Sequence, residues 1–440
     1  MSKQRVAYYY DSSAPNHHYG PGHPMKPQRM RLAYELVLSY GLDRQMDMLQ
    51  SRRASQAELV RYHDPDYINF LAKVAPMHTG SSGYYGEKNR QSVNYDVDEA
   101  AKLYNVGEQS DCPLFDGLFE FIQFSCGGSI DAAKRLNANK SEICINWAGG
   151  LHHAKKTEAS GFCYGNDIVL AILELLTVHH RVLYIDIDVH HGDGVEEAFY
   201  YSNRVMTCSF HKFGQEFFPG TGDLNDVGGD EGYGFTVNFP LKDGLDDKNF
   251  QFCFKPVIAK IMEVFDPGAV VLQCGADSLA GDRLGVFDLS IKGHASCVEF
   301  VKSFNRPLLV LGGGGYTPSN VARCWAFETS VCVGVDIANE IPSTDPFYEY
   351  YAPSHSMHQA QMDRVHRSTS GPGLRGAALD TSDKNSAEYL TLCKDSILYK
   401  LDTVVRAAPS VSWLDVPPAW ITGEQQEAER VAAIAVEEAE

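Results

Sequence analysis

The stretch Val182–Phe199, VLYIDIDVHHGDGVEEAF, decides the expected fold. Its first part, Leu183–Ile187, is apolar apart from one acid, which is typical of a strand inside a parallel sheet. Five ionisable residues crowd the carboxyl end of this strand within eight positions, ahead of an acidic helix start. A buried acid is costly unless it is paired or binds a metal, and α/β sheets bind ligands at this end of their strands. We therefore expect a metal site here rather than a polar loop with chance histidines. The five residues are Asp186, Asp188, His190, His191 and Asp193.

Similar apolar runs recur along the chain and alternate with segments of helical spacing. This alternation predicts an α/β fold with a parallel sheet. The further expected strands are Val6–Tyr10, Ile143–Trp147, Arg204–Phe210, Gly268–Cys274 and Pro307–Leu311. The expected helices are Arg29–Tyr40, Ala57–Val74, Phe115–Leu136 and Asp167–Leu176.

Four of the apolar strands end in a polar or glycine-rich cluster. Because parallel strands present their carboxyl ends at one edge of a sheet, we expect the clusters to meet in one site. They contain His152 with His153, Asp188 with His190, Asp277, and Tyr316.

No linker-like change in composition divides residues 5–350, so we expect one catalytic domain there. Residues 351–418 are expected to form a C-terminal extension with a docked helix, which starts at a capping box of Asn385 and Glu388. Residues 419–440 are expected to be an acidic tail, either disordered or a solvated helix.

The composition restricts the class of protein. The net charge of −19 argues against direct binding to nucleic acid and suits a basic substrate or partner, although acidity also serves solubility. No apolar run is long enough to span a membrane and no signal peptide is present, so we expect a soluble intracellular protein. The 11 cysteines lack paired spacing and are expected to be reduced core residues.

The clustered residues have a consistent chemistry. Asp188, His190 and Asp277 offer three ligands to one divalent ion and leave a position open for water, with zinc as the expected ion and iron(II) as the alternative. The pair His152–His153 offers a general base and a charge-stabilising imidazole, with Asp186 and Asp193 available to orient the rings. The same edge of the sheet also carries Tyr316, either a turn residue or a donor to a developing oxyanion. Together these groups predict hydrolysis of an amide.

Gly161, Phe162 and Phe218 offer a narrow aromatic wall for an extended apolar chain. Aromatic residues in loops also serve as simple packing residues, and the sequence leaves both interpretations open.

Several ordered blocks resemble the zinc-dependent class I histone deacetylases of the arginase/deacetylase superfamily. They are WAGGLHHAKK, ASGFCY, DIDVHHGDGVEEAF, FFPGTGD, GADSLAGDRLG and LGGGGYT, and weaker matches extend the resemblance over roughly residues 5–418. The resemblance implies a single α/β domain around an eight-stranded parallel sheet with helices on both faces.

The resemblance also implies the roles of individual residues. It makes Asp188, His190 and Asp277 the zinc ligands, His153 the general base and acid, and His152 its electrostatic companion. Asp193 and Asp186 would orient the two histidines, and Tyr316 would polarise the acetyl carbonyl. The implied substrate-binding residues are Asp111, Gly161, Phe162, Phe218 and Leu284. The implied potassium site comprises Asp186, Asp188, His190, Ser209 and Phe210. The implied inositol-phosphate patch comprises His18, Lys26, Arg283 and Arg323.

The resemblance makes acetyl-lysine in histone tails or other proteins the expected substrate, with a corepressor subunit as a partner. Nuclear localisation, with a cytoplasmic pool as a second option, follows from the same comparison. The segment 77–103, Gln109–Ser110, the loop before Phe218, and Gly165 depart from the family pattern, so the identity of the partner is the open question. Deacetylation of small polyamines and a catalytically inactive scaffold are the competing functions, and Asp111 and Tyr316 respectively argue against them.

Overall fold

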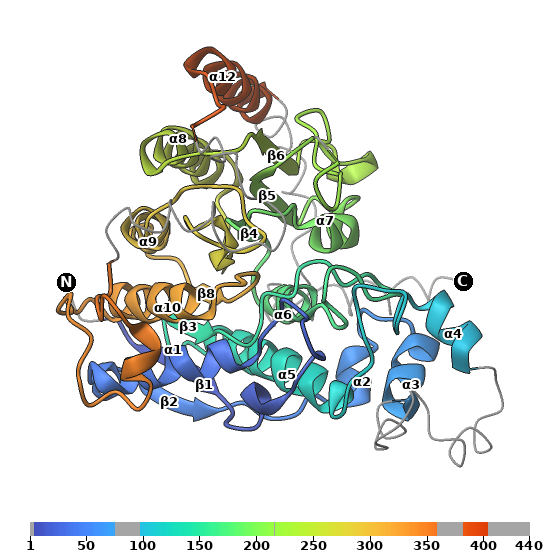
Figure 1. Cartoon of the computed structure of the whole chain (residues 1–440). Coiled ribbons are helices and arrows are strands. Elements are labelled where there is room, and N and C mark those ends of the chain that lie inside the picture. Colours follow the sequence, from blue (N-terminus) through green and yellow to red (C-terminus); the bar gives the residue numbers. More distant parts are fainter. Residues whose placement is uncertain (1–3, 75–96, 215, 359–381, 404–440) are drawn as a thin grey trace, which may run out of the picture.

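The structure is a computed structural model that describes residues 4–74, 97–214, 216–358 and 382–403. In these residues eight parallel strands form one sheet in the order β2-β1-β3-β8-β7-β4-β5-β6 (Figure 1). The predicted α/β fold with an eight-stranded parallel sheet is therefore confirmed. The strands are β1 Val6–Tyr10, β2 Asp47–Gln50, β3 Ile143–Asn146, β4 Val182–Asp186, β5 Val205–Lys212, β6 Thr236–Leu241, β7 Ala269–Gln273 and β8 Leu308–Leu311.

Helices cover both faces of the sheet. Figure 1 shows α1, α8, α9 and α10 on one side and α5, α6 and α7 on the other. The helices are α1 Gln28–Ser39, α2 Gln56–Leu59, α3 Pro65–Val74, α4 Val97–Leu103, α5 Leu118–Asn137, α6 Asp167–Leu175, α7 Asp193–Phe199, α8 Asp247–Phe265, α9 Ile291–Lys302, α10 Pro318–Val333 and α12 Ala387–Thr403.

The alternation of side chains along the central strands explains their continuous apolar runs. On β4, Leu183 and Ile185 belong to the core under α8, α9 and α10, whereas Val182 and Tyr184 belong to the core under α5, α6 and α7. Both faces are buried, so neither needs polar residues. The acids of this strand therefore appear only at its carboxyl end, beyond the packed layer.

One predicted helix is wrong. Instead of a single helix over Ala57–Val74, the chain forms α2 and then α3, which begins at Pro65. Proline disfavours helical backbone at the residue before it, and the Asp64 carboxylate accepts a hydrogen bond of 2.8 Å from the backbone N–H of Asp66 to start the new helix.

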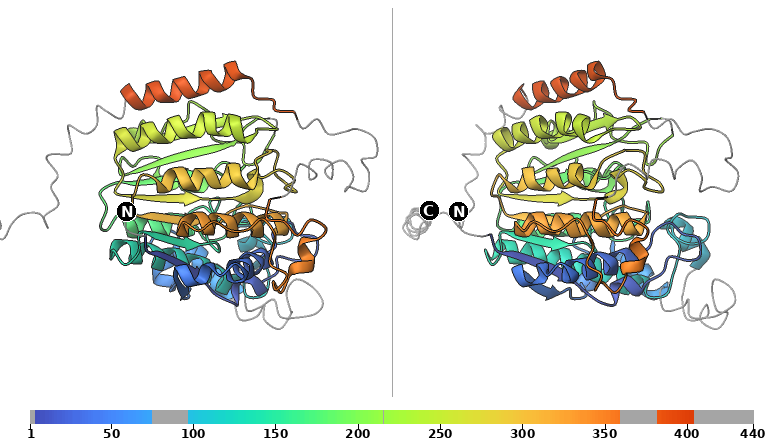
Figure 2. Two further views of the ribbon diagram at one scale, coloured as in Figure 1. Left: turned by 90° about the vertical axis from the view of Figure 1, so that its left-hand side faces the viewer. Right: turned by 60° about the vertical axis from the view of Figure 1, so that its left-hand side comes forward.

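The C-terminal helix α12 packs on α8 and β6, and Figure 2 shows it as the outermost of the helices stacked along one side of the sheet. The predicted capping box is wrong. The Asn385 side chain instead exchanges two hydrogen bonds with the backbone of Lys242, of 2.8 and 2.9 Å, and the Ser386 hydroxyl accepts from the backbone N–H of Tyr389. The expected tail, residues 419–440, and most of the 77–103 segment lie outside the described residues.

Within the described ranges, none of the helices has both the length and the apolar character needed to cross a membrane.

The strand order determines where the polar clusters meet. The strands β3, β8, β7 and β4 are consecutive neighbours at the centre of the sheet. They are also the four strands whose carboxyl ends precede the histidine pair, Tyr316, Asp277 and Asp188. Residues separated by more than 160 positions in the sequence are thereby brought to one edge of the sheet.

Candidate active site

The side chains of Asp188, His190 and Asp277 converge at the carboxyl ends of β4 and β7. The Nδ1 atom of His190 lies 3.1 Å from Asp188 Oδ1 and 3.1 Å from Asp277 Oδ2. All three residues are buried, and their ligand atoms lie within 4.8 Å of one another. This is the trio that the sequence analysis proposed as ligands of one ion.

Backbone donors hold both carboxylates in place. The Oδ2 atom of Asp188 accepts a hydrogen bond of 2.8 Å from the Gly314 N–H, and Asp277 Oδ1 accepts one of 2.9 Å from the Val189 N–H. The Gln273 side chain, which the sequence analysis missed, donates to Asp188 Oδ2 at 2.9 Å. Gln273 is the last residue of β7, and its type alone gave no signal of this role.

The electrostatics of the trio fit a divalent cation. Burial, and then the negative charge of Asp188, raise the pKa of Asp277 to about 7. Burial lowers the pKa of His190, but hydrogen bonds to the two carboxylates outweigh it and raise the value to about 10. Two buried carboxylates around one imidazole form a ligand set of two oxygens and one nitrogen, which suits zinc or iron(II).

The adjacent histidines each contact their own carboxylate. The Nδ1 atom of His152 lies 2.7 Å from Asp186 Oδ2, and the Nδ1 atom of His153 lies 2.7 Å from Asp193 Oδ1. The second oxygen of Asp193 bonds the ammonium of Lys155 at 2.7 Å, a contact that sequence reasoning did not anticipate. A carboxylate on Nδ1 fixes the tautomer of each ring and leaves Nε2 for chemistry.

The two histidines have opposite charge preferences. Burial lowers the pKa of His152, but the negative charges of Asp186 and Asp188 outweigh it and raise the value to about 9. Burial, and then the positive charge of His152, lower the pKa of His153 to about 3. Near neutral pH the arrangement therefore favours a cationic His152 beside a neutral His153 that can accept a proton.

Tyr316 packs over the metal-ligand trio. Its ring contacts the rings of Phe162 and His190, with centroids 5.7 and 6.4 Å away. Burial, and then the charges of Asp277 and Asp188, raise its pKa well above the usual range, so the phenol keeps its proton and can donate a hydrogen bond.

Two residues that the sequence analysis did not assign to the site hold the Tyr316 loop. The Asp282 carboxylate accepts a hydrogen bond of 2.6 Å from the Tyr316 backbone N–H. The buried guanidinium of Arg29 donates to the carbonyls of Gly313 and Gly315, at 2.5 Å each. Both residues reach this loop from positions far away in the sequence, so no local pattern pointed to them.

Phe218 and Gly161 lie directly against the His153 ring. The ring of Phe218 meets the His153 ring edge to face at 4.9 Å, and a side chain on Gly161 would collide with both rings. Gly161 has φ +52°, a left-handed conformation that glycine adopts without strain. Phe217, in the loop before Phe218, stacks on the His190 ring at 5.1 Å and was not anticipated. Leu284, the remaining residue of the implied substrate site, is half-buried and follows Asp282 in the sequence.

Asp111 lies exposed beside this aromatic wall. Its Oδ2 atom accepts a hydrogen bond of 3.2 Å from the Gly161 N–H, and its backbone carbonyl contacts His23 Nε2 at 3.2 Å. The His23 ring in turn packs on Phe162. The departure at Gly165 does not lie at this rim, because Gly165 is buried and a side chain there would meet Ile122 of α5.

The residues of the implied potassium site lie at the end of β4, in the loop that follows it, and on the neighbouring strand β5. Asp186 and Ser209 are partners in the sheet register, and Asp186 Oδ1 accepts from the Asp188 N–H at 3.1 Å. The Phe210 ring packs among aromatic residues of the core, so this residue has only its backbone carbonyl to offer a cation.

The structure places the four residues of the implied inositol-phosphate patch in different environments. Arg283 and His18 are exposed and Lys26 is half-buried. Arg323 is 1% exposed, and its guanidinium donates to the carbonyls of Ser319, Tyr351 and Ser356.

Comparison with known proteins identifies the family. The histone deacetylase domain family matches residues 23–332. Type-1 histone deacetylase 1 of Dictyostelium discoideum is 50% identical over 420 residues, which cover 95% of this chain and 77% of the relative. Histone deacetylase 1 of Homo sapiens is 55% identical over 368 residues, covering 84% and 72%. Histone deacetylase HDAC1 of Drosophila melanogaster is 51% identical over 430 residues, covering 98% and 75%. The chain therefore belongs to the histone deacetylase family, among its class I members.

Proposed function

We propose that this chain hydrolyses the acetyl amide of N6-acetyl-lysine in histone tails or other proteins, with a zinc ion held by Asp188, His190 and Asp277. Family membership makes the chain a lysine deacetylase and an amide hydrolase. The observation that carries the mechanism is the convergence of the three ligand atoms beside the His153–Asp193 pair. Iron(II) is the alternative ion for the same ligand set.

In this proposal each residue has a defined role in the reaction. When bound, the zinc ion supplies a Lewis acid for the acetyl carbonyl and the attacking water. His153, neutral and oriented by Asp193, takes the proton of the water and later delivers it to the lysine amine that leaves. The cationic His152, held by Asp186, stabilises the negative charge that develops, and the Tyr316 hydroxyl donates to the acetyl oxygen.

Substrate binding is assigned to the aromatic wall and its rim. Gly161, Phe162, Phe218 and Leu284 would enclose the apolar stem of the acetylated lysine. Asp111, which already accepts a backbone N–H in this structure, would accept the backbone amides of the substrate. The net charge of −19 favours approach of a basic histone tail and disfavours direct contact with nucleic acid.

The remaining ligands and partners are proposed from the resemblance. A structural potassium ion would lie near Asp186, Asp188, His190, Ser209 and Phe210. An inositol phosphate, with a corepressor subunit, would bind His18, Lys26 and Arg283. Arg323 would join them only if it released the backbone carbonyls that it now contacts. A histone substrate implies action in the nucleus.

Assays on purified protein test the activity. Acetyl-lysine peptides and acetylated polyamines would be compared, each with and without a chelator and with zinc restored afterwards. We expect peptide deacetylation that stops on chelation and returns with zinc. Preference for polyamines would contradict the substrate assignment, and full activity in metal-free protein would contradict the metal mechanism.

A separate experiment tests the inositol-phosphate proposal. Calorimetry with inositol hexakisphosphate would compare wild type with Arg283→Ala, with and without a corepressor-type partner. We expect binding that weakens in the variant and at high salt. Equal binding by the two proteins would remove Arg283 from the patch.

A further inference from the structure

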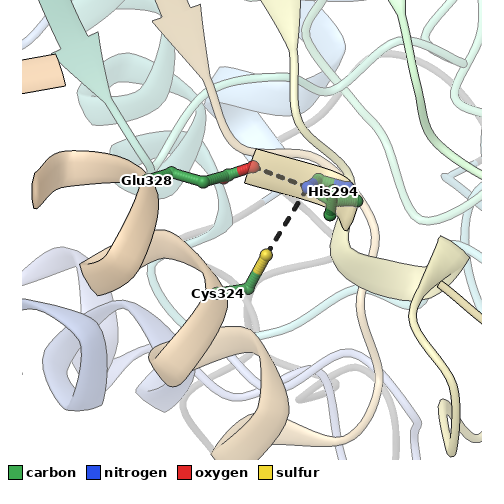
Figure 3. A group of neighbouring side chains, drawn as sticks. All are labelled: His294, Cys324 and Glu328. Atoms are coloured by element: carbon green, nitrogen blue, oxygen red, sulfur yellow. Dashed lines mark hydrogen bonds and ion pairs between the residues drawn. The ribbon is translucent and has the colours of Figure 1, made fainter. Parts of the chain in front are cut away.

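A second buried cluster with a histidine and an acid lies between α9 and α10. His294 comes from α9, and Cys324 and Glu328 lie one turn apart on α10, so that all three point toward one another (Figure 3). His294, Cys324 and Glu328 are completely buried. None of them is part of the proposed chemistry, so their burial needs another explanation.

Both ring nitrogens of His294 are engaged. The Nδ1 atom lies 2.5 Å from Glu328 Oε1, and the Nε2 atom lies 3.0 Å from the backbone carbonyl of Gly275. A carbonyl oxygen only accepts hydrogen bonds, so Nε2 carries a proton and donates it to Gly275. The carboxylate on Nδ1 fixes the ring in the orientation that this donation requires. Cys324 Sγ is farther away, at 3.5 Å from Nδ1.

The Gly275 carbonyl belongs to the segment that carries a proposed metal ligand. Gly275 follows β7 and precedes Asp277 by two positions. Its backbone lies directly against the other acidic ligand, because a Cβ atom on Gly275 would stand 1.9 Å from Asp188 Oδ2. A small displacement of this glycine therefore shifts the separation between the two carboxylates.

A side chain of α10 also bonds the same segment directly. The indole Nε1–H of Trp325 donates to the carbonyl of Cys274 at 3.0 Å. Consecutive carbonyls, Cys274 and Gly275, thus accept hydrogen bonds from the same packed layer of α9 and α10. The helices behind the site form a rigid support for the loop that presents Asp277.

The same three side chains have ligand types that also suit a metal ion, since a histidine, a cysteine and a glutamate converge there. Two ligand atoms bound to one tetrahedral zinc at ~2.0–2.1 Å would be about 3.3 Å apart. The 2.5 Å between Nδ1 and Oε1 is that of a direct hydrogen bond, and Nε2 is already committed to Gly275. The geometry favours a hydrogen-bonded support over a second metal site.

We propose that His294 and Glu328 are positioning residues for the metal centre, which they support by fixing the Gly275 carbonyl and through it Asp277. The inference rests on the proposed function, because it assigns this pair a role toward the proposed ion. Residues that orient metal ligands typically contribute 10–100-fold to metal affinity.

The test is zinc affinity, measured by competition with a chelator, and the absorption spectrum of the cobalt-substituted protein. Glu328→Leu removes the orienting carboxylate at similar volume and should weaken zinc binding by about 10–100-fold and change the cobalt spectrum. Glu328→Gln keeps a group that can hydrogen-bond to Nδ1, because its amide N–H can donate to the neutral ring, and should retain most of the affinity. Cys324→Ala is the matched control on the same helix and should bind zinc like wild type.

The outcomes separate this inference from the proposed function. If wild type binds no zinc, the proposed metal centre itself fails. If wild type binds one zinc and folded Glu328→Leu binds it equally well with an unchanged cobalt spectrum, only the positioning role fails. Wild type could instead bind two zinc ions, one of which is lost in both Glu328→Leu and Cys324→Ala. That result would make the cluster of His294, Cys324 and Glu328 a metal site and would overturn the inference. If Glu328→Leu does not fold, the zinc affinity and cobalt spectrum of His294→Gln are measured instead, and the same outcomes decide.

Discussion

Two buried clusters lie on opposite sides of Gly275 and differ in the balance of their charges. On one side a single imidazole, His190, faces two carboxylates. On the other side a single imidazole, His294, faces one carboxylate and one backbone carbonyl. The first cluster carries one more acid than its histidine can neutralise, whereas the second is balanced. The comparison indicates that charge balance, and not the mere gathering of ligand-type residues, separates a candidate metal centre from a structural support.

The largest expected effect is the loss of one acid from the unbalanced cluster. Asp188→Ala should lose zinc and reduce deacetylation below detection, because one ligand is gone and the remaining groups no longer require a cation. Metal content and peptide deacetylation are the measurements. Asp266→Asn, at an exposed carboxylate paired with Arg306, is the control and should behave like wild type. If Asp188→Ala retained zinc and activity, the excess acid would not be what makes the first cluster a metal centre.

The second prediction concerns Tyr316, whose ring contacts His190 of the same cluster. Tyr316→Phe should keep its fold and zinc but lose ~10²–10³-fold in kcat, the usual contribution of one oxyanion donor. KM should change little if the hydroxyl acts mainly in the transition state. Steady-state kinetics decide, with Tyr399→Phe, at an exposed tyrosine, as the control. A wild-type kcat would reduce Tyr316 to a packing residue and remove it from the proposed mechanism.

The third prediction concerns the effect of zinc on the free energy of unfolding. Zinc that binds only the folded state should raise the free energy of unfolding of the metal-free protein by about 2.7 kcal/mol at a concentration of 100 times Kd. Denaturant unfolding with and without zinc measures the shift. The shift should disappear in Asp188→Ala. An equal shift in that variant would mean that another cluster, such as that of His294, accounts for the binding.

The sequence predicted the central strands and missed both edges of the sheet. The strands β2 and β6 are the two outermost strands in the observed order. The residues of β2 are half-buried or exposed, and β6 contains Pro240, which is tolerated only where an N–H is not needed by a neighbour. β2 is not buried on both faces and so lacks a continuous apolar run. β6 is buried throughout, but Asn238 and Pro240 interrupt its apolar run, so the pattern gave no signal for either strand.

In the site, the sequence indicated residues with unusual chemistry and missed those with ordinary chemistry. Clustered histidines and acids at strand ends are improbable without a function, so Asp188, His190 and His153 could be singled out. Gln273, Asp282 and Glu328 act through hydrogen bonds to residues far away in the sequence. Their roles depend on tertiary geometry that no local pattern encodes.

A third buried histidine extends the comparison to a site with no neighbouring acid. His63 is 1% exposed, and its Nε2 atom accepts a hydrogen bond of 2.9 Å from the Asn166 N–H. Burial lowers its pKa to about 4, whereas two carboxylates raise that of His190 to about 10. Burial favours the neutral form of a histidine, and the charges beside the ring decide whether that preference is reversed.

The smallest expected effect follows from His63. Between pH 6.5 and 4 the unfolded chain binds a proton at this residue and the native protein does not, so stability falls as pH falls. With a folded pKa of about 4 and an ordinary value of 6.5, the loss between pH 7 and pH 5 is ~2 kcal/mol. His63→Gln removes the titrating group, and its stability should decline less over this range by about that amount. Urea unfolding at pH 7 and pH 5 measures both proteins, and their shared carboxylates cancel in the difference. If the two proteins lose equal stability, His63 is protonated in the native state, and burial alone does not keep a buried histidine neutral.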